Sequence, residues 1–321
     1  MAAVDSFQLL YREIARSCNC YVETLALVGA FYTASKAVVF ARDCYTLIRL
    51  HFIPRLMYNR NLVHRFGGWA VIYGATEAVA KAYAEELARH GVSIILISRN
   101  SSSVEGTAKA IADSHGVETV LVEADFSQGH AVCRPIQNAV MGKDIGFLVN
   151  SIDLSLDYPQ RFTDLPEDRL WDTINRNITA ATLMTRIVLP GMVERGRGAV
   201  INISSGWCCK PTPNKAAFSA STAYLDHVSR ALHYEYGHRG IFVQSLVPFC
   251  VASPDNVERR SMRCGGWLVP HPRVYARHAI STLGISHRTT GYWPHSLQFW
   301  FLQYMPEWMW VWGTHMVTGT G

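Results

Sequence analysis

The sequence has few charged residues for its length and no long basic run. Charged residues make up 17% of the 321 residues, and 30 Lys and Arg against 25 Asp and Glu leave a net charge of only +5. A nucleic-acid-binding protein gathers basic residues into a patch or stripe, so we expect no nucleic-acid partner. The 49% of hydrophobic residues allows one large buried core.

Paired cysteine motifs are also missing. The chain has 8 cysteines and no Cys-x-x-Cys pair. Cys18 and Cys20 are separated by one residue, and Cys208 and Cys209 are adjacent, which suits neither a zinc site nor a secreted disulfide framework. The 13 histidines form no His-Glu-x-x-His motif. We therefore expect no metal, and reduced thiols in an intracellular protein.

Residues 1–66 are rich in aromatic and aliphatic side chains. Charged residues interrupt the first turns, which argues against a cleavable secretory signal. The stretch from Thr24 to Ala41 would be a transmembrane candidate if Lys36 did not lie within it. We favour an amphipathic membrane-associated or organelle-targeting segment; a true span and a helical pair packed on the core are the alternatives. The basic residues that favour targeting are Arg12, Arg16, Lys36, Arg42, Arg49 and Arg55.

From Trp69 onward, short β runs alternate with helical stretches, the pattern of a parallel sheet with crossover helices. This alternation predicts an α/β fold, a doubly wound (Rossmann) parallel sheet. We expect that domain to span 67–285, between an N-terminal helical segment, 1–66, and an aromatic-rich C-terminal extension, 286–321. The predicted strands are 69–73, 92–98, 119–123, 147–150, 199–204 and 241–247, and the first helix is 79–90.

The C-terminal extension has an unusual density of amphipathic aromatic residues. Such rings favour the boundary between water and membrane. They also favour protein interfaces. This segment is therefore either an interaction surface or simple packing on the domain. The aromatic residues are Tyr292, Trp293, Trp300, Tyr304, Trp308, Trp310 and Trp312.

The turn after the first strand keeps only one of the glycines that a dinucleotide site uses. Those glycines let the chain turn sharply, approach the pyrophosphate and pack the helix closely, while the helix N-terminus faces the phosphates. Gly74 remains, but Ala78 and Ala80 stand at the other two positions. A methyl clash of about 1 to 3 kcal/mol would weaken binding roughly tenfold to a hundredfold. The cofactor-binding turn comprises Gly74, Ala75, Thr76, Ala78, Val79 and Ala80.

Several motifs together resemble the short-chain dehydrogenase/reductase family, over about residues 67–295. They are the glycine turn, Ile-Ser-Arg at 97–99, Ala-Asp-Phe at 124–126, Val-Asn at 149–150 and Asn-Ile-Ser-Ser at 202–205. Further runs are similar to the 17β-hydroxysteroid and 3-ketoacyl reductase branch, and within it to inactive hydroxysteroid dehydrogenase-like members. These runs lie at 82–87, 189–195 and 208–213.

The resemblance implies an NADP(H) site that is weak or lost. By position, Arg99 would face a ribose 2′-phosphate, unless it is only an exposed charge at a strand end. Asp125 would lie near the adenine. The family's Asn-Asn-Ala-Gly is here the run from Asn150 to Asp153, which puts a carboxylate where a glycine would border the cofactor.

The resemblance also implies that the catalytic set is broken. Family members donate a proton from a Tyr whose pKa is lowered by a Lys four residues later, while a Ser and an Asn assist. Ser205 and Asn177 match the assisting pair, but Phe218 and Thr222 replace the Tyr and the Lys. Thr222 also leaves the cofactor ribose without its lysine contact. Because a positioned acid contributes about 10² to 10⁴ in rate, we expect an inactive homologue, and Tyr224 lies on another helix face.

The function predicted is therefore a pseudo-oxidoreductase with an interaction or regulatory role. A residual NADPH-dependent reductase of a steroid or fatty-acyl carbonyl and a nucleotide sensor are the alternatives. The resemblance implies a mitochondrion, or alternatively the endoplasmic-reticulum membrane, and a homodimer through the helices of Asn177 and Phe218. The N-terminal segment favours peripheral membrane contact. The sequence does not identify a protein partner.

Overall fold

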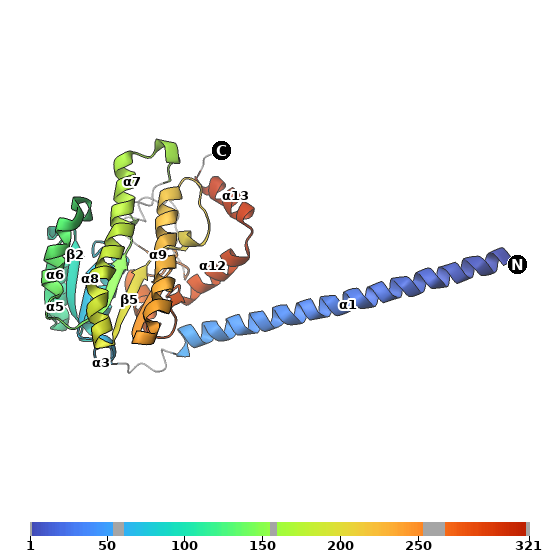
Figure 1. The fold of residues 1–321 in the computed structure, drawn as a ribbon, viewed down its shortest axis with the longest axis horizontal. Coiled ribbons are helices and arrows are strands. Elements are labelled where there is room, and N and C mark those ends of the chain that lie inside the picture. The colour runs from blue at the N-terminus through green and yellow to red at the C-terminus, as the bar shows by residue number, and fades with distance from the viewer. Residues whose placement is uncertain (1, 54–60, 155–158, 253–266, 319–321) are drawn as a thin grey trace. The chain divides into compact units, whose positions relative to one another are not determined.

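The computed structural model describes residues 2–53, 61–154, 159–252 and 267–318, and the chain divides into two units, Met1–Phe52 and Ile53–Gly321. The first unit is one continuous helix, α1 (Ala2–His51), and not a helical pair (Figure 1). Leu25, Leu27 and Val28 are all more than 60% exposed. Since residues of an α-helix are about 100° apart around its axis, they point to different sides. By length and composition alone, Tyr11–His51 could cross a membrane.

The second unit is built on a parallel sheet of seven strands. Alternate side chains of each strand face opposite sides, so Ala70 and Ile72 enter one core while Val71 and Tyr73 enter the other. The strand order is β3-β2-β1-β4-β5-β6-β7. The strands are β1 (Trp69–Tyr73), β2 (Ser93–Ser98), β3 (Thr119–Glu123), β4 (Ile145–Ser151), β5 (Gly198–Ile203), β6 (Ile241–Leu246) and β7 (Arg288–Thr289).

Helices cover both faces of this sheet. One core contains side chains of α4, α5 and α11, and the other contains side chains of α6, α8 and α9. The helices are α3 (Leu62–Phe66), α4 (Ala78–Arg89), α5 (Ser102–His115), α6 (Cys133–Val140), α7 (Glu167–Thr173), α8 (Ala180–Arg195), α9 (Ala216–Tyr236), α11 (Pro272–Ser281), α12 (Trp293–Tyr304) and α13 (Glu307–Thr318).

The predicted doubly wound sheet is confirmed, and each of the six predicted strands lies within two residues of its observed bounds. Strand β7 was missed because two residues are too short to show an apolar alternation. The strand order reverses between β1 and β4, and ligands of such sheets bind beyond the carboxyl ends of the strands at this point. The three-part division into domains stays a prediction.

Candidate functional site

The turn between β1 and α4 is pressed against the end of β4. Gly74 has a φ of +78°, and a Cβ there would come within 2.8 Å of the carbonyl oxygen of Ser151. Both the left-handed backbone and the close approach require glycine. Gly74 is therefore needed for the fold, whether or not a nucleotide binds.

The other residues of this turn differ in what they face. Ala75 and Ala80 are fully buried in the core, and Thr76 is exposed. Ala78 and Val79 line a cavity at the carboxyl edge of the sheet. The methyl group of Ala80 thus packs between helix and sheet, and of the two alanines only Ala78 reaches the cavity.

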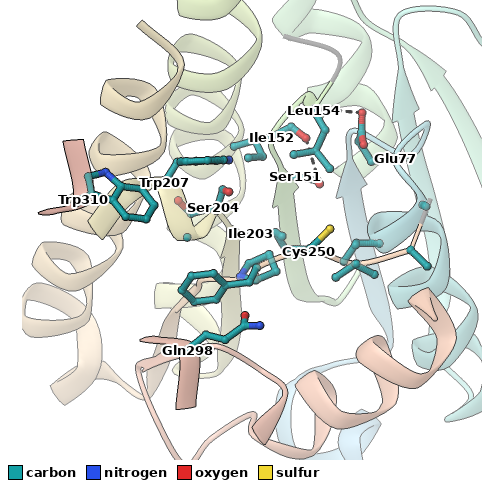
Figure 2. Close-up of a pocket in the computed structure, with 18 residues that line it drawn as sticks. Glu77, Ser151, Ile152, Leu154, Ile203, Ser204, Trp207, Cys250, Gln298 and Trp310 are labelled. Carbon is teal, nitrogen blue, oxygen red and sulfur yellow. Dashed lines mark hydrogen bonds between the residues drawn. The ribbon is translucent and has the colours of Figure 1, made fainter. Parts of the chain in front are cut away.

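Glu77, the residue that precedes α4, also lines the cavity. Its carboxylate accepts a hydrogen bond from the backbone N–H of Leu154 at 3.2 Å, which joins the first turn to the loop after β4 (Figure 2). The N-terminus of a helix carries a partial positive charge that favours an anion. Here the chain itself supplies that anion at the end where a pyrophosphate would lie.

Arg99, at the end of β2, forms an ion pair inside the chain. Its Nη2 lies 3.6 Å from Oδ2 of Asp153, and Nη1 of Arg176 lies 3.1 Å from the same oxygen. The Arg99 side chain stays 43% exposed, whereas those of Asp153 and Arg176 are 18% and 16% exposed. The Asp153 carboxylate therefore lies between the two arginines and is held there by both ion pairs.

Two further residues predicted to bind cofactor hold the fold together. The Asp125 carboxylate accepts from the backbone N–H of Ser127 at 3.1 Å. The Asn150 side chain is buried and donates from Nδ2 to Oδ1 of Asn202 at 2.8 Å, across β4 and β5. Buried amides need such partners, so Asn150 is a link between strands in this structure.

The cavity has a volume of about 320 Å³ and a mainly apolar wall with a few polar groups (Figure 2). This size and lining suit a small apolar molecule with one or two polar groups. Of the described residues that line it, Glu77 and Cys250 carry the ionisable groups. The lining residues are Glu77, Ala78, Val79, Ser151, Ile152, Leu154, Ile203, Ser204, Ser205, Gly206, Trp207, Pro248, Phe249, Cys250, Val251, Ala252, Gln298 and Trp310.

One wall of the cavity is held by a buried histidine. The backbone N–H of Phe249 donates to Nδ1 of His295 at 3.3 Å, and Nε2 of His295 donates to the carbonyl of Leu268 at 3.1 Å. Burial lowers the pKa of His295 to about 4. The imidazole is therefore neutral at physiological pH and acts as a structural clamp.

Ser205 and Asn177 have different surroundings. Ser205 is buried and lines the cavity. Asn177 lies in the π-helical turn η4 (Ile174–Thr179), where its Oδ1 accepts from the N–H of Asp153 at 3.0 Å and its Nδ2 donates to Oγ of Ser221 at 3.0 Å. Single π-helical turns are frequent at functional sites. The side-chain amide of Asn177 is nevertheless engaged in holding the loop of Asp153 to α9.

Phe218, at the position of the family's acid, packs in an apolar cluster. Its ring is 3% exposed and belongs to a group with Ile152, Ala181 and Leu225. Phe218 is not among the residues that line the cavity. A group of this kind contributes to packing and offers no proton to a ligand.

Thr222 is fully buried, and its hydroxyl is used within its own helix. Oγ1 donates to the carbonyl of Ser219 at 2.7 Å, and the carbonyl of Thr222 accepts from Oγ of Ser204 at 2.8 Å. The hydroxyl of Tyr224 lies 2.8 Å from Oγ1 of Thr182 on α8. Tyr224 thus bonds to α8, and its partly buried ring packs against the same cluster as Phe218.

The residues missed from the sequence are those that join distant segments. Trp310 and Gln298 line the cavity from the C-terminal helices. The pairing of Asp153 with Arg99 could have been predicted from the sequence. Both residues follow strands adjacent to β1 and therefore lie at one edge of the sheet. The role of Trp310 had no comparable signal.

Comparison with known proteins gives one consistent family. The family model described as short chain dehydrogenase matches residues 68–263. The chain is 63% identical over 320 residues to "Inactive hydroxysteroid dehydrogenase-like protein 1" of Danio rerio, covering 99% of both chains. It is 61% identical over 317 residues to the Homo sapiens protein of the same name, covering 99% of this chain and 96% of that one. A "Very-long-chain 3-oxoacyl-CoA reductase" of Anas platyrhynchos is 41% identical, covering 75% and 76%.

Two solved structures share the fold. One, from work on 7beta-hydroxysteroid dehydrogenase stereoselectivity, has a TM-score of 0.71 at 24% identity and covers 79% of this chain and 99% of its own. A short-chain dehydrogenase from Sphingobium yanoikuyae in complex with NADPH has a TM-score of 0.58 at 24% identity, covering 66% and 82%. At this identity the likeness extends to the fold alone.

Proposed function

The chain belongs to the short-chain dehydrogenase family, and from this premise we propose that it is a member whose nucleotide cleft is closed by its own carboxylates. It acts by binding other molecules, in an interaction or regulatory role. The family uses NADP(H), as the complex named above illustrates. The observation that carries the proposal is the ion pair of Arg99 with Asp153, at the place of the cofactor's phosphate-binding arginine.

The chain is a catalytically inactive member of the family, as the relatives at 60 to 63% identity are named. The physical reason lies at two positions. Phe218 has no hydroxyl and is packed among apolar side chains, and Thr222 has no charge and donates to its own helix. A hydride delivered to a carbonyl would create an alkoxide that neither Phe218 nor Thr222 could neutralise as the family's acid and cation do.

A dinucleotide fits the described residues poorly. Its phosphates would meet the carboxylates of Glu77 and Asp153, both already engaged within the chain. At an effective dielectric constant of about 20, two like unit charges about 5 Å apart repel by roughly 3 kcal/mol. A repulsion of that size lowers affinity roughly a hundredfold. The adjacent Arg99 cannot offset it without leaving Asp153.

A calorimetric NADPH titration of three forms of the full chain tests this closure. Asp153→Asn removes the carboxylate's charge and releases Arg99, so we expect affinity at least about tenfold higher than that of the natural chain. Asp172→Asn is the matched control. Asp172 lies on α7 and pairs at 2.6 Å with Arg176, the second arginine beside Asp153. Micromolar binding by the natural chain, or equal gains in both variants, would overturn the proposal.

We also propose a cellular location for the protein. The long apolar helix α1 and its basic residues support attachment to a mitochondrial membrane, with the endoplasmic reticulum as the second location. A fusion of residues 1–66 to a fluorescent reporter tests whether this segment directs the protein to mitochondria. Assembly as a homodimer through the helical segments of Asn177 (η4) and Phe218 (α9) belongs to the same proposal, and sedimentation of the full chain in detergent measures it.

Residual reductase activity is the second candidate, and the position of Ser205 favours it. Ser205 lines the cavity, where its hydroxyl could hold a water beside a carbonyl substrate. Under this candidate, Ser205→Ala abolishes NADPH oxidation with a steroid or 3-ketoacyl ketone. If the natural chain shows no oxidation to abolish, the candidate is excluded.

A further inference from the structure

The outer side of α12 carries a stripe of exposed apolar side chains. Residues spaced by three and four lie on one face of a helix, and four such residues of α12 are between 40% and 61% exposed. The opposite side of α12 is buried, at Pro294, His295 and Leu302. The exposed residues are Leu297, Trp300, Phe301 and Tyr304.

Helix α13, which follows α12 along the chain, also exposes apolar side chains. Four of its large apolar side chains are between 41% and 70% exposed, and Figure 1 shows both helices at the edge of the second unit. They are Trp308, Met309, Trp312 and Met316. We call the eight side chains of the two helices the aromatic face. Neighbouring large apolar groups of this number are uncommon on a protein surface that faces only water.

Charge is almost missing from these helices. Between residues 293 and 318, Glu307 is the one Asp, Glu, Lys or Arg in the sequence. Surfaces in water usually intersperse about a quarter or more of charged residues. A non-obligate protein interface also keeps a polar rim around its apolar centre. The composition is instead that of a segment at a membrane boundary, where Trp and Tyr place their rings at headgroup level.

We infer that the aromatic face docks on a lipid bilayer. The occupant is the headgroup and upper acyl region, into which amphipathic helices insert their apolar side chains while lying in the plane of the membrane. The inference rests on the proposed membrane attachment in one respect: a chain held at a bilayer by α1 presents the second unit to lipid at high effective concentration.

The inner side of the same helices forms part of the cavity. Nε1 of Trp310 donates to the carbonyl of Pro211 at 3.1 Å, and its ring centroid lies 5.7 Å from that of Trp207. Trp310 and Gln298 both line the cavity (Figure 2). When the aromatic face docks, α12 and α13 lie between the cavity and the lipid. This arrangement suits an apolar ligand that enters the cavity from the bilayer.

Photolabelling of the full chain in phosphatidylcholine vesicles tests the inference. A phosphatidylcholine with a diazirine on its acyl chain is activated, and trypsin peptides are quantified by mass spectrometry. Since no Lys or Arg follows Arg288, residues 289–321 are released as one peptide, and residues 17–36 report α1. We expect label on 289–321 at least about tenfold above that on the peptides of Trp171 and Tyr234, exposed aromatic residues elsewhere.

The two labelled regions give separate answers. Label on 17–36 without label on 289–321 overturns the aromatic face and leaves the proposed attachment intact. Label on 289–321 alone supports the aromatic face and overturns attachment by α1, and label on neither overturns both. Trp308→Ser with Trp312→Ser removes two exposed rings and should reduce label on 289–321 several-fold, whereas the control Trp171→Ser leaves it unchanged. Equal label in both variants contradicts a docking role for these rings.

Discussion

The nucleotide end and the catalytic end of the proposed site depart from a working reductase in opposite ways. At the nucleotide end, our proposal is a gain of charge: the carboxylates of Glu77 and Asp153, both engaged within the chain, would meet a cofactor's phosphates. At the catalytic end, the proposal is a loss of charge: at the positions predicted for the family's acid and cation, Phe218 has an apolar ring and Thr222 a hydroxyl that donates to its own helix. Both changes are compatible with a well-packed fold, because each new group has partners within the chain.

This comparison implies that the two ends fail independently. Restoring the acid and the cation by Phe218→Tyr and Thr222→Lys should give no turnover while Asp153 closes the nucleotide end. Adding Asp153→Gly should raise NADPH oxidation with a 3-ketoacyl or steroid ketone by about 10² to 10⁴ over the same variant with Phe218 retained. Steady-state rates measure this. Turnover in the double variant alone would show that the nucleotide end is open.

The catalytic end should behave as core in unfolding experiments. Phe218 is 3% exposed in a cluster with Ile152 and Leu225, so Phe218→Ala should lower the free energy of unfolding by about 3 to 5 kcal/mol. Phe218→Tyr, which keeps the ring, is the control. Urea unfolding followed by circular dichroism measures both. A loss below about 1 kcal/mol for Phe218→Ala would show that the ring is not packed.

The cavity wall that His295 holds should make stability depend on pH. Burial lowers the pKa of His295 from 6.5 to about 4, so between these values the unfolded chain binds a proton that the folded chain does not. The stability contributed by neutral His295 is complete above pH 6.5 and is lost as pH falls toward 4, by on the order of 3 kcal/mol. Urea unfolding at a series of pH values measures it.

The control for this pH dependence is His295→Gln. Glutamine can accept from the N–H of Phe249 and donate to the carbonyl of Leu268 without titrating. The loss of stability between pH 6.5 and 4 should therefore be smaller in the variant than in the natural chain. Equal losses would assign the effect to other groups.

The sequence predicted the sheet well because its strands are continuous apolar runs bounded by turns, which is typical of a buried parallel sheet. The assignment of Phe218 and Thr222 to the positions of the family's acid and cation rests on a fixed spacing from Ser205 and stays a prediction. The positions of their side chains could not be read from spacing, because the packing of Phe218 against Ile152 depends on the tertiary fold.

Contacts between distant segments were the least predictable. Trp310 bonds to Pro211 across 99 residues of sequence, and the local aromatic density around Trp310 does not identify this partner. Crowding by Ala80 was expected from the glycine spacing, but its methyl group is in the core. Asp153 was recognised as a departure from glycine, yet its ion pairs follow from which strands flank β1.

The smallest expected effect concerns the ion pairs at the nucleotide end. Asp153 and Arg176 are mostly buried, and their charged hydrogen bond is 3.1 Å long. Asp153→Asn should therefore destabilise the fold by about 1 to 2 kcal/mol. The control is Glu85→Gln, because Glu85 pairs at 3.0 Å with an Arg273 side chain that is 72% exposed, where an ion pair contributes about 0 to 1 kcal/mol.

A double-mutant cycle of Asp153→Asn with Arg176→Gln, by urea unfolding, isolates the coupling of the buried pair. The same Asp153→Asn variant is expected to bind NADPH more tightly, so one substitution should weaken the fold and open the cleft together. A loss of stability together with a gain in NADPH affinity would show that the Asp153 carboxylate both stabilises the fold and closes the cleft. An inert replacement of glycine would change neither quantity. If Asp153→Asn changes neither the free energy of unfolding nor the NADPH affinity, the carboxylate does not close the nucleotide end. The proposed difference in charge between the two ends is then wrong.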